Sequence, residues 1–253
     1  MKTDRINQIH ELVEKYGKIS YDELHSFLPN VSQMTLRRDI SFLEEQGVLV
    51  KIPNGAVSMD EIQKKSEEQF IKRVGRNVLE KKEIAEKAIS VIKPKSCIFI
   101  DGGSTTLYFA KELPNDSYYI VTNALNVASE VLKNSLPTVA LLGGDVIRNN
   151  LITIGQSSLD FLDKINIEVA VMTSTGFLPS TGSFTCGSQP EVEIKSAVIK
   201  KASKVVMLLD SSKVNVNTPY TFASYKDVDC LVVDKNFPKE LREDIKSKNI
   251  MVI

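Results

Sequence analysis

The sequence predicts an α/β protein with a small helical domain at the N-terminus and a larger domain built on a mainly parallel sheet. Two short helices joined by a tight turn are indicated before residue 47. From residue 96 onward, short apolar runs alternate with helical segments, which is typical of parallel strands covered by helices. A chain of 253 residues leaves room for one small domain and one of ordinary size.

The composition is that of a globular protein, with 42% hydrophobic and 25% charged residues. No secretory signal, lipidation motif or apolar run near the roughly 18 residues of a membrane span is visible, so we expect a cytoplasmic protein without a membrane partner. Cys97, Cys186 and Cys230 are far apart, and His10 and His25 have no partner at ligand spacing. We therefore expect no disulfide framework, metal site or cofactor.

The first two predicted helices are short. Residues 5–16 place apolar side chains on one helical face, at Ile6, Ile9, Leu12, Val13 and Tyr16. Gly17 ends this helix. Ser20-Tyr21-Asp22-Glu23 is a capping box that opens a second helix containing Leu24, Phe27 and Leu28. Leu28-Pro29-Asn30 then supplies a tight turn into a third helix.

The third helix has an apolar face and a polar face. Ser32 suits its N-cap, Gly47 ends it, and the apolar face carries Leu36, Ile40 and Leu43. The opposite face carries Met34, Arg37, Arg38 and Ser41. Guanidinium groups suit phosphate oxygens and guanine edges. An isolated pair of arginines is more typical of a solvated surface helix, but the preceding helix and turn favour a DNA-binding helix-turn-helix.

The net charge gives no support to nucleic-acid binding. It is zero for the whole chain, and residues 1–57 contain seven Lys or Arg against eight Asp or Glu. The usual basic domain is therefore absent, and DNA affinity must come from where the cations lie. Because counterion release scales with the phosphates neutralised, one such domain would bind weakly, and we expect a homo-oligomer, either a dimer or a tetramer.

A longer motif covers the third helix and the residues after it. It reads Val31-Ser32-x-x-Thr35-Leu36-Arg37-Arg38-Asp39-Ile40-x-x-Leu43-Glu44-x-x-Gly47-x-Leu49, with Asn54-Gly55-Ala56 downstream. This motif resembles the signature of the DeoR family of bacterial transcriptional regulators. The resemblance implies a winged helix-turn-helix domain over residues 1–57, with the Ser32–Gln46 helix in the major groove and Val48–Val57 as the wing. The DNA contacts expected on this basis are Ser20, Ser32, Gln33, Met34, Thr35, Arg37, Arg38, Ser41 and Lys51.

The remaining chain predicts a linker and a second domain. Residues 58–76 are charge-rich and are predicted to form a partly helical linker, and a helix over 79–92 opens a domain over 77–253. Strands are predicted at Cys97–Ile100, Tyr119–Thr122, Thr138–Leu142, Val169–Thr173, Lys204–Leu209, Cys230–Val233 and Asn249–Ile253. Helices are predicted at 105–113, 124–133 and 191–202.

Five polar or glycine-bearing turns come after these strands. They are Asp101–Thr106, Asn123, Gly143–Asp145, Ser174–Phe177 and Asp210–Lys213. In parallel sheets, ligands bind beyond the carboxyl ends of the strands. The first turn has two glycines, three hydroxyls and a following helix N-terminus, which together suit an anion such as phosphate. Lys213 could supply a point charge, and Asp101 and Asn123 could bind sugar hydroxyls.

The resemblance to the DeoR family continues through these turns, at Asp101–Thr106, Val121–Asn126, Leu142–Gly144 and Asp210–Lys213. It implies a sensor domain similar to ribose-5-phosphate isomerase and CoA transferases that receives sugar phosphates, with Glu191 and Lys195 keeping an acidic and a basic position. The expected ligand contacts are Asp101, Gly102, Gly103, Ser104, Thr105, Thr106, Asn123, Gly143, Gly144, Glu191 and Lys213.

Together these features favour a transcriptional repressor of a sugar-metabolism operon. Its partners would be double-stranded operator DNA and a phosphorylated sugar that controls operator binding. The alternative is a sugar-phosphate isomerase-like enzyme, in which Asp101, Glu191 or Glu193 would act as the base. Against the enzyme, these carboxylates form no recognisable catalytic constellation. A DNA-architectural protein is a third class, but it leaves the polar turns unexplained.

Overall fold

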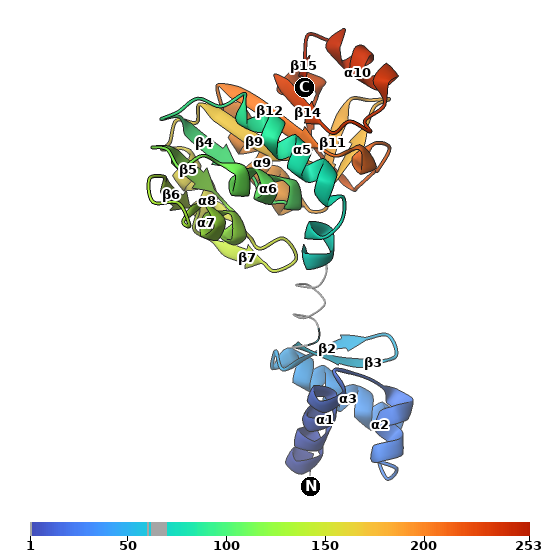
Figure 1. Ribbon diagram of the computed structural model, residues 1–253. Coiled ribbons are helices and arrows are strands. Elements are labelled where there is room, and N and C mark those ends of the chain that lie inside the picture. Colours follow the sequence, from blue (N-terminus) through green and yellow to red (C-terminus); the bar gives the residue numbers. More distant parts are fainter. Residues whose placement is uncertain (1, 60, 62–69) are drawn as a thin grey trace. The chain divides into compact units, whose positions relative to one another are not determined.

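The chain folds into two compact units, Met1–Gln69 and Phe70–Ile253 (Figure 1). The structure is a computed structural model, which describes residues 2–59, 61 and 70–253. Part of the predicted linker, 58–76, lies outside the described residues, namely residues 60 and 62–69. Residues 70–74, at the start of the second unit, are helical. No described helix has the length and apolar character needed to cross a membrane.

The first unit is a winged helix-turn-helix domain, as predicted. Its helices are α1 (Lys2–Tyr16), α2 (Tyr21–Phe27) and α3 (Gln33–Glu45). Its strands β1 (Lys18–Ser20), β2 (Leu49–Ile52) and β3 (Gly55–Ser58) form an antiparallel sheet in the order β1-β3-β2. The β2–β3 hairpin lies where the wing was expected, while β1 was not predicted.

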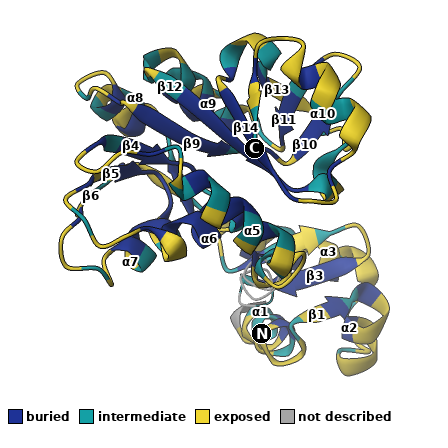
Figure 2. Ribbon diagram, turned by 45° about the horizontal axis from the view of Figure 1, so that its top comes forward, coloured by how far each residue is buried: buried dark blue, intermediate teal, exposed yellow. Residues whose placement is uncertain are grey.

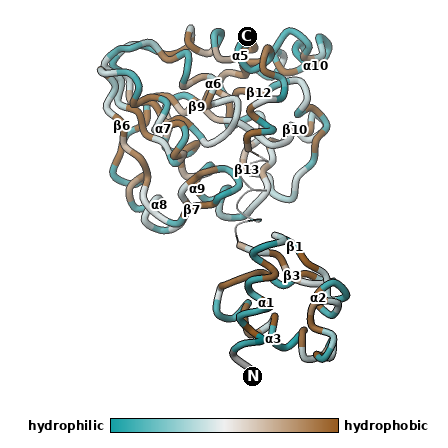
Figure 3. The backbone as a smooth tube through the Cα atoms, turned by 60° about the horizontal axis from the view of Figure 1, so that its bottom comes forward, coloured by the Kyte–Doolittle hydropathy of each residue, from teal (hydrophilic) through white to brown (hydrophobic). Residues whose placement is uncertain are grey.

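The core of this unit is formed where the three helices meet. Its buried side chains include Ile9, Val13, Leu24, Leu36, Ile40 and Leu43. Along the chain, hydrophobic and hydrophilic segments alternate accordingly (Figure 3). At the end of α1, Tyr16 is 47% exposed and stacks on Phe27 of α2 with 5.5 Å between ring centroids. Asp39 is buried in this unit and accepts a 2.6 Å hydrogen bond from Nε of Arg5.

The second unit is built on a sheet of seven parallel strands. Their order is β15-β14-β12-β9-β4-β5-β6, and each neighbouring pair is parallel. The bounds are β4 (Cys97–Ile100), β5 (Tyr119–Thr122), β6 (Thr138–Leu141), β9 (Val169–Thr173), β12 (Lys204–Leu209), β14 (Cys230–Val233) and β15 (Met251–Val252). The predicted strands are thus confirmed, with small differences at their ends.

Helices cover both faces of this sheet (Figures 1 and 2). Helices α5 (Val78–Ile89), α6 (Ser104–Glu112) and α7 (Leu125–Val131) pack on one face, against side chains such as Ile98, Ile100 and Leu208. Helices α8 (Gln156–Leu162), α9 (Gln189–Lys201) and α10 (Lys239–Lys246) pack on the other, against Phe99, Met207 and Leu209. Successive residues of a strand therefore enter different cores, as the pleat requires.

Several short elements were not predicted. Strands β7 (Asp145–Ile147) and β8 (Ile152–Ile154) form a hairpin after β6. Strands β10 (Gly176–Leu178), β11 (Ser183–Cys186) and β13 (Tyr220–Ser224) form a small antiparallel sheet. Two 3-10 turns lie at Ser211–Lys213 and Tyr225–Asp227. Strands such as Asp145–Ile147 and Ser183–Cys186 mix polar and apolar residues, so they lack the continuous apolar run that marked the strands of the parallel sheet.

Candidate functional site

Helix α3 presents to solvent a face that carries Arg37 and Arg38 together with Met34. Oγ of its N-cap residue, Ser32, accepts a 3.2 Å hydrogen bond from the backbone N–H of Thr35. The apolar positions of the helix are buried, which leaves Met34 82% exposed and both Arg37 and Arg38 exposed. Two adjacent guanidinium groups on an exposed helix face can reach the phosphates and base edges of a major groove.

Arg37 is held by an aromatic ring that the sequence did not reveal. Its guanidinium carbon lies 4.5 Å from the centroid of the Tyr21 ring. Tyr21 is the first residue of α2 and is only 1% exposed, so its ring is fixed by the core. Such a cation–π contact limits the rotamers of Arg37, which lowers the entropy lost when the side chain binds. Spacing within α3 gives no signal for a partner on α2.

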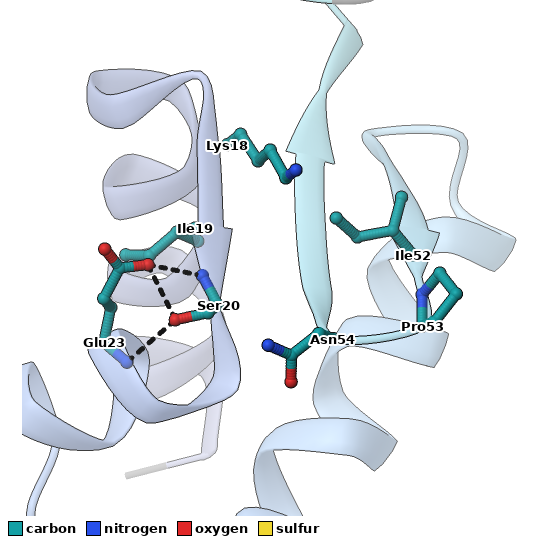
Figure 4. Close-up of a pocket in the computed structure, with 7 residues that line it drawn as sticks. All are labelled: Lys18, Ile19, Ser20, Glu23, Ile52, Pro53 and Asn54. Atoms are coloured by element: carbon teal, nitrogen blue, oxygen red, sulfur yellow. Dashed lines mark hydrogen bonds between the residues drawn. The ribbon is translucent and has the colours of Figure 1, made fainter.

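Two of the serines expected to contact DNA, Ser20 and Ser32, also cap helices. Ser20 and Glu23 form a capping box, in which the Ser20 N–H donates to Oε2 of Glu23 at 2.7 Å and the Glu23 N–H donates to Oγ of Ser20 at 3.2 Å (Figure 4). The backbone N–H of Ser20, followed by its hydroxyl, holds the pKa of Glu23 below its usual value. Figure 4 also shows Lys18 and Asn54 lining a hollow between β1 and the tip of the wing.

The wing is fixed to the recognition helix at Lys51. Its backbone N–H donates to Oε1 of Glu44 at 2.9 Å, and its Nζ donates to Oγ of Ser41 at the same distance. Gln33, in the first turn of α3, donates to Oδ1 of Asp22 on α2 at 2.8 Å. The predicted DNA contacts therefore lie on α3, on the wing strand beside it and at the start of α2, in one unit.

The second unit has a polar pocket at the carboxyl ends of its central strands. The loop before α6 contributes Gly102, Gly103, Ser104 and Thr105, and Lys213 lines the same pocket. The other lining residues are Arg73, Asn150, Thr173, Ser174, Thr175, Glu191 and Lys195. Seven of the twelve come from the predicted turns, namely the four loop residues with Ser174, Thr175 and Lys213.

The two glycines of the pocket leave no room for a side chain. A Cβ on Gly102 would lie 2.1 Å from Cγ2 of Ile152, and a Cβ on Gly103 would lie 2.5 Å from Cγ2 of Thr173. Gly103 is the N-cap of α6, so the first N–H groups of this nine-residue helix point toward the pocket end. Backbone donors at a helix N-terminus favour an anionic ligand.

The charges of the pocket are mainly positive. Arg73, Lys195 and Lys213 contribute cations, against the single carboxylate of Glu191. Lys195 forms a buried ion pair with Asp101, in which Nζ of Lys195 donates a hydrogen bond to Oδ2 of Asp101. The charge of Lys195 is therefore balanced within the protein. Burial lowers the pKa of Arg73, and the charge of Glu191 partly opposes this effect. Arg73 and Lys213 remain as cations without an ion-pair partner closer than 4.0 Å among the described residues.

Five of the expected ligand contacts do not line this pocket. Asp101 is buried beneath it, and Thr106 is buried and donates to the Gly103 carbonyl at 3.1 Å. Asn123 is buried and donates to the Thr153 carbonyl at 3.3 Å. Gly143 and Gly144 lie just before the β7–β8 hairpin and are exposed. Of the five predicted turns, Ser174–Phe177 and Asp210–Lys213 therefore contribute to the pocket together with Asp101–Thr106. Asn123 and the Gly143–Gly144 pair do not line it.

Six lining residues were missing from the expected ligand contacts, although two of them, Ser174 and Thr175, belong to a predicted turn. Arg73 lies before α5, and Asn150 lies in the hairpin that was not predicted. Thr173 is the last residue of β9, and Lys195 was placed on the helix but not among the contacts. The position of Thr173 at a strand end was the one cue available. No described group of three His, Cys, Asp or Glu side chains could hold a metal ion.

The fold and the two sites define a class of protein: a transcriptional regulator with a DNA-reading winged helix and a separate ligand-sensing domain. Family comparison agrees at both ends of the chain. Residues 5–62 match the DeoR-like helix-turn-helix domain, and residues 76–235 match the DeoR C-terminal sensor domain. The chain belongs to the DeoR family of transcriptional regulators, and the resemblance seen in the sequence is confirmed.

Several relatives span almost the whole chain. The transcriptional regulator GolR of Listeria innocua is 32% identical, with 98% of this chain and 97% of the relative covered. The regulator IolR of Bacillus subtilis is 33% identical over 95% and 94%, and the lactose phosphotransferase system repressor of Staphylococcus epidermidis is 31% identical over 97% of both chains. Ribose 5-phosphate isomerase A from Methanocaldococcus jannaschii aligns with a TM-score of 0.40 and 18% identity over 53% of each chain. The family membership shows a regulator rather than the alternative enzyme.

Proposed function

We propose that this protein represses a sugar-metabolism operon and that a phosphorylated sugar bound in the Gly102–Lys213 pocket controls its affinity for operator DNA. The observation that supports this most is the pocket itself, where a helix N-terminus and two unpaired cations converge. A relative named as a lactose phosphotransferase system repressor supports the repressor role.

The phosphate group would bind at the loop before α6. There the N–H groups and hydroxyls of Ser104 and Thr105 share with Lys213 a cavity of about 60 Å³. That space holds about four water molecules, so it admits a small polar group. The sugar would extend toward Glu191, whose carboxylate can accept hydrogen bonds from hydroxyls.

The first test measures operator binding with and without the effector. Fragments of promoters, including the protein's own, are titrated with the full chain in the presence of ribose 5-phosphate, fructose 6-phosphate, glucose 6-phosphate or inorganic phosphate. We expect one phosphosugar to change operator affinity by roughly 5- to 150-fold, and operator DNA to change the affinity for that sugar by the same factor. Indifference to every DNA fragment would remove the proposal.

Truncation of the exposed arginines tests the DNA interface. We expect Arg37→Ala or Arg38→Ala to weaken operator binding by about 1 to 3 kcal/mol if the side chain reads a base edge, and to relax the sequence preference. Fluorescence anisotropy on operator and scrambled duplexes measures both effects. Lys15→Ala is the matched control, since Lys15 is an exposed cation in the last turn of α1. Equal losses for Lys15→Ala would contradict a specific role for α3.

We also propose that the protein binds DNA as a homo-oligomer, a dimer or a tetramer. Each winged helix offers few cations to DNA, so a second copy raises the number of phosphates neutralised. In a dimer, the two winged helix-turn-helix domains would occupy operator half-sites about 34 to 36 Å apart, or a multiple of that spacing. Light scattering of the free protein measures the oligomer, and footprinting measures the half-site spacing.

A further inference from the structure

Arg73 lies in the wall of the anion pocket but belongs to the segment that enters the second unit. It is part of the helical stretch 70–74, upstream of α5. Residue 70 is the first residue of the second unit, and residues 62–69, which precede it in sequence, lie outside the described residues. Arg73 is thus the pocket residue closest in sequence to the DNA-binding unit.

The guanidinium of Arg73 has hydrogen-bond partners at Nη2 but, among the described residues, none at Nε. Its Nη2 donates to the Asn149 carbonyl at 2.8 Å and to Oδ1 of Asn150 at 2.7 Å. Its Nε is buried and has no hydrogen-bond partner among the described residues. A buried donor without an acceptor costs roughly 1 to 3 kcal/mol, so an anion that reached Nε would recover free energy there.

The backbone of the same segment is held by a buried lysine. Lys81, on α5, is 3% exposed, and its Nζ donates to the carbonyls of Arg73 and Arg76. Burial is the main cause that lowers the pKa of Lys81 to about 8. Further along, Nδ2 of Asn77 donates to Oδ1 of Asp210 at 3.2 Å and to Oγ of Ser212 at 3.0 Å. The entry segment 70–77 is therefore tied to the turn that carries Lys213.

We propose that Arg73 binds the anionic group of the effector and that this contact transmits occupancy of the pocket to the entry segment 70–77. The proposal rests on the proposed function of the pocket. A ligand shifts a conformational equilibrium only through contacts that differ between the two states. Arg73 provides such a contact, because it meets the ligand only when segment 70–77 is docked on α5 and the hairpin. Lys213, Ser104 and Thr105 bind the anion without belonging to that segment.

The test compares Arg73→Gln with two variants of matched charge change. Lys213→Gln removes a cation from the pocket outside the entry segment. Arg76→Gln removes an exposed arginine three residues away that does not line the pocket. Full-length proteins are titrated by calorimetry with the three phosphosugars and inorganic phosphate, and operator affinity is measured at zero and saturating anion. Thermal melting checks that each variant folds, and Arg73→Lys replaces Arg73→Gln if the latter does not.

We expect Arg73→Gln and Lys213→Gln each to weaken anion binding by about tenfold or more. The response of each protein is the ratio of its operator affinity at zero anion to that at saturating anion. This ratio should remain as in wild type for Lys213→Gln and Arg76→Gln, but should approach one for Arg73→Gln. Arg73→Lys, which keeps the charge but not the guanidinium fork, should give an intermediate ratio. Hydrogen exchange in 70–77 should slow with anion in wild type and not in Arg73→Gln.

The outcomes separate this inference from the proposed function. If the wild-type protein binds none of the phosphate compounds and its operator affinity does not change when they are added, the proposed function is wrong and the inference fails with it. If wild type responds and Arg73→Gln keeps the full ratio and the slowed exchange, the pocket is an effector site but the inference is wrong. The inference is supported if Arg73→Gln, but neither Lys213→Gln nor Arg76→Gln, loses both the anion-dependent change in operator affinity and the slowed hydrogen exchange in 70–77.

Discussion

Asp101→Asn is expected to lower the free energy of unfolding of the sensor unit by about 3 to 5 kcal/mol. The change leaves the Lys195 ammonium buried without its counterion, since the side chains of Lys195 and Asp101 are 7% and 3% exposed. The remaining groups near Nζ of Lys195 are the Thr173 carbonyl at 2.9 Å and the Phe222 ring at 4.8 Å. Urea-induced unfolding followed by circular dichroism measures the loss.

Two further variants identify the cause of that loss. The double variant Asp101→Asn with Lys195→Met removes the unpaired charge, so it should be more stable than Asp101→Asn alone. Glu130→Gln breaks the exposed pair in which the side chains of Lys133 and Glu130 are 68% and 18% exposed, and it should change stability by less than about 1 kcal/mol. A loss of equal size for Glu130→Gln would show that burial of the Asp101 pair does not matter.

Gly55→Ala is expected to destabilise the winged unit by about 3 kcal/mol or more. Because the winged unit carries the predicted DNA contacts, operator binding should be lost as well. Gly55 has a φ of +157°, and a Cβ there would lie 2.0 Å from the backbone carbonyl oxygen of Ile19. A backbone atom cannot move aside like a side chain, so β1 and β3 must separate. Separation would remove the β1–β3 pairing that includes Ser20 opposite Gly55.

A matched glycine in the same unit provides the control. Gly47 has a φ of +71° but no atom within 4 Å of a Cβ, so Gly47→Ala should cost only the roughly 1 to 2 kcal/mol of a left-handed residue. Thermal unfolding resolves the two, because 1 kcal/mol shifts the midpoint by about 4 to 8 °C in a domain of this size. Equal shifts for both variants would contradict the steric explanation.

The recognition helix could be predicted almost to the residue because its signals are local. Ser32 is the N-cap, the apolar stripe of Leu36, Ile40 and Leu43 is buried, and the capping box at Ser20 is formed. The strands of the parallel sheet were equally visible, since strands buried on both faces are continuous apolar runs.

The pocket could be predicted only in part because its walls come from distant segments. Asp101 was expected to face a ligand, but its partner Lys195 is 94 residues away and draws it beneath the pocket. Arg73 and Asn150 come from a charge-rich segment and an unpredicted hairpin, where neither periodicity nor a motif marks a binding residue. Glu193, which was considered as a base, is exposed and lines a groove with Leu159 of α8 instead.

The polar pocket is lined in part by turns and helix starts at the edge of a sheet whose two cores lie on its faces. Substitutions at Ser104, Thr175 or Asn150 therefore alter the shape and charge offered to a small molecule while the strands and their packing remain intact. For the proposed effector site, such a construction would let a few substitutions change the preferred ligand without the loss of a foldable scaffold.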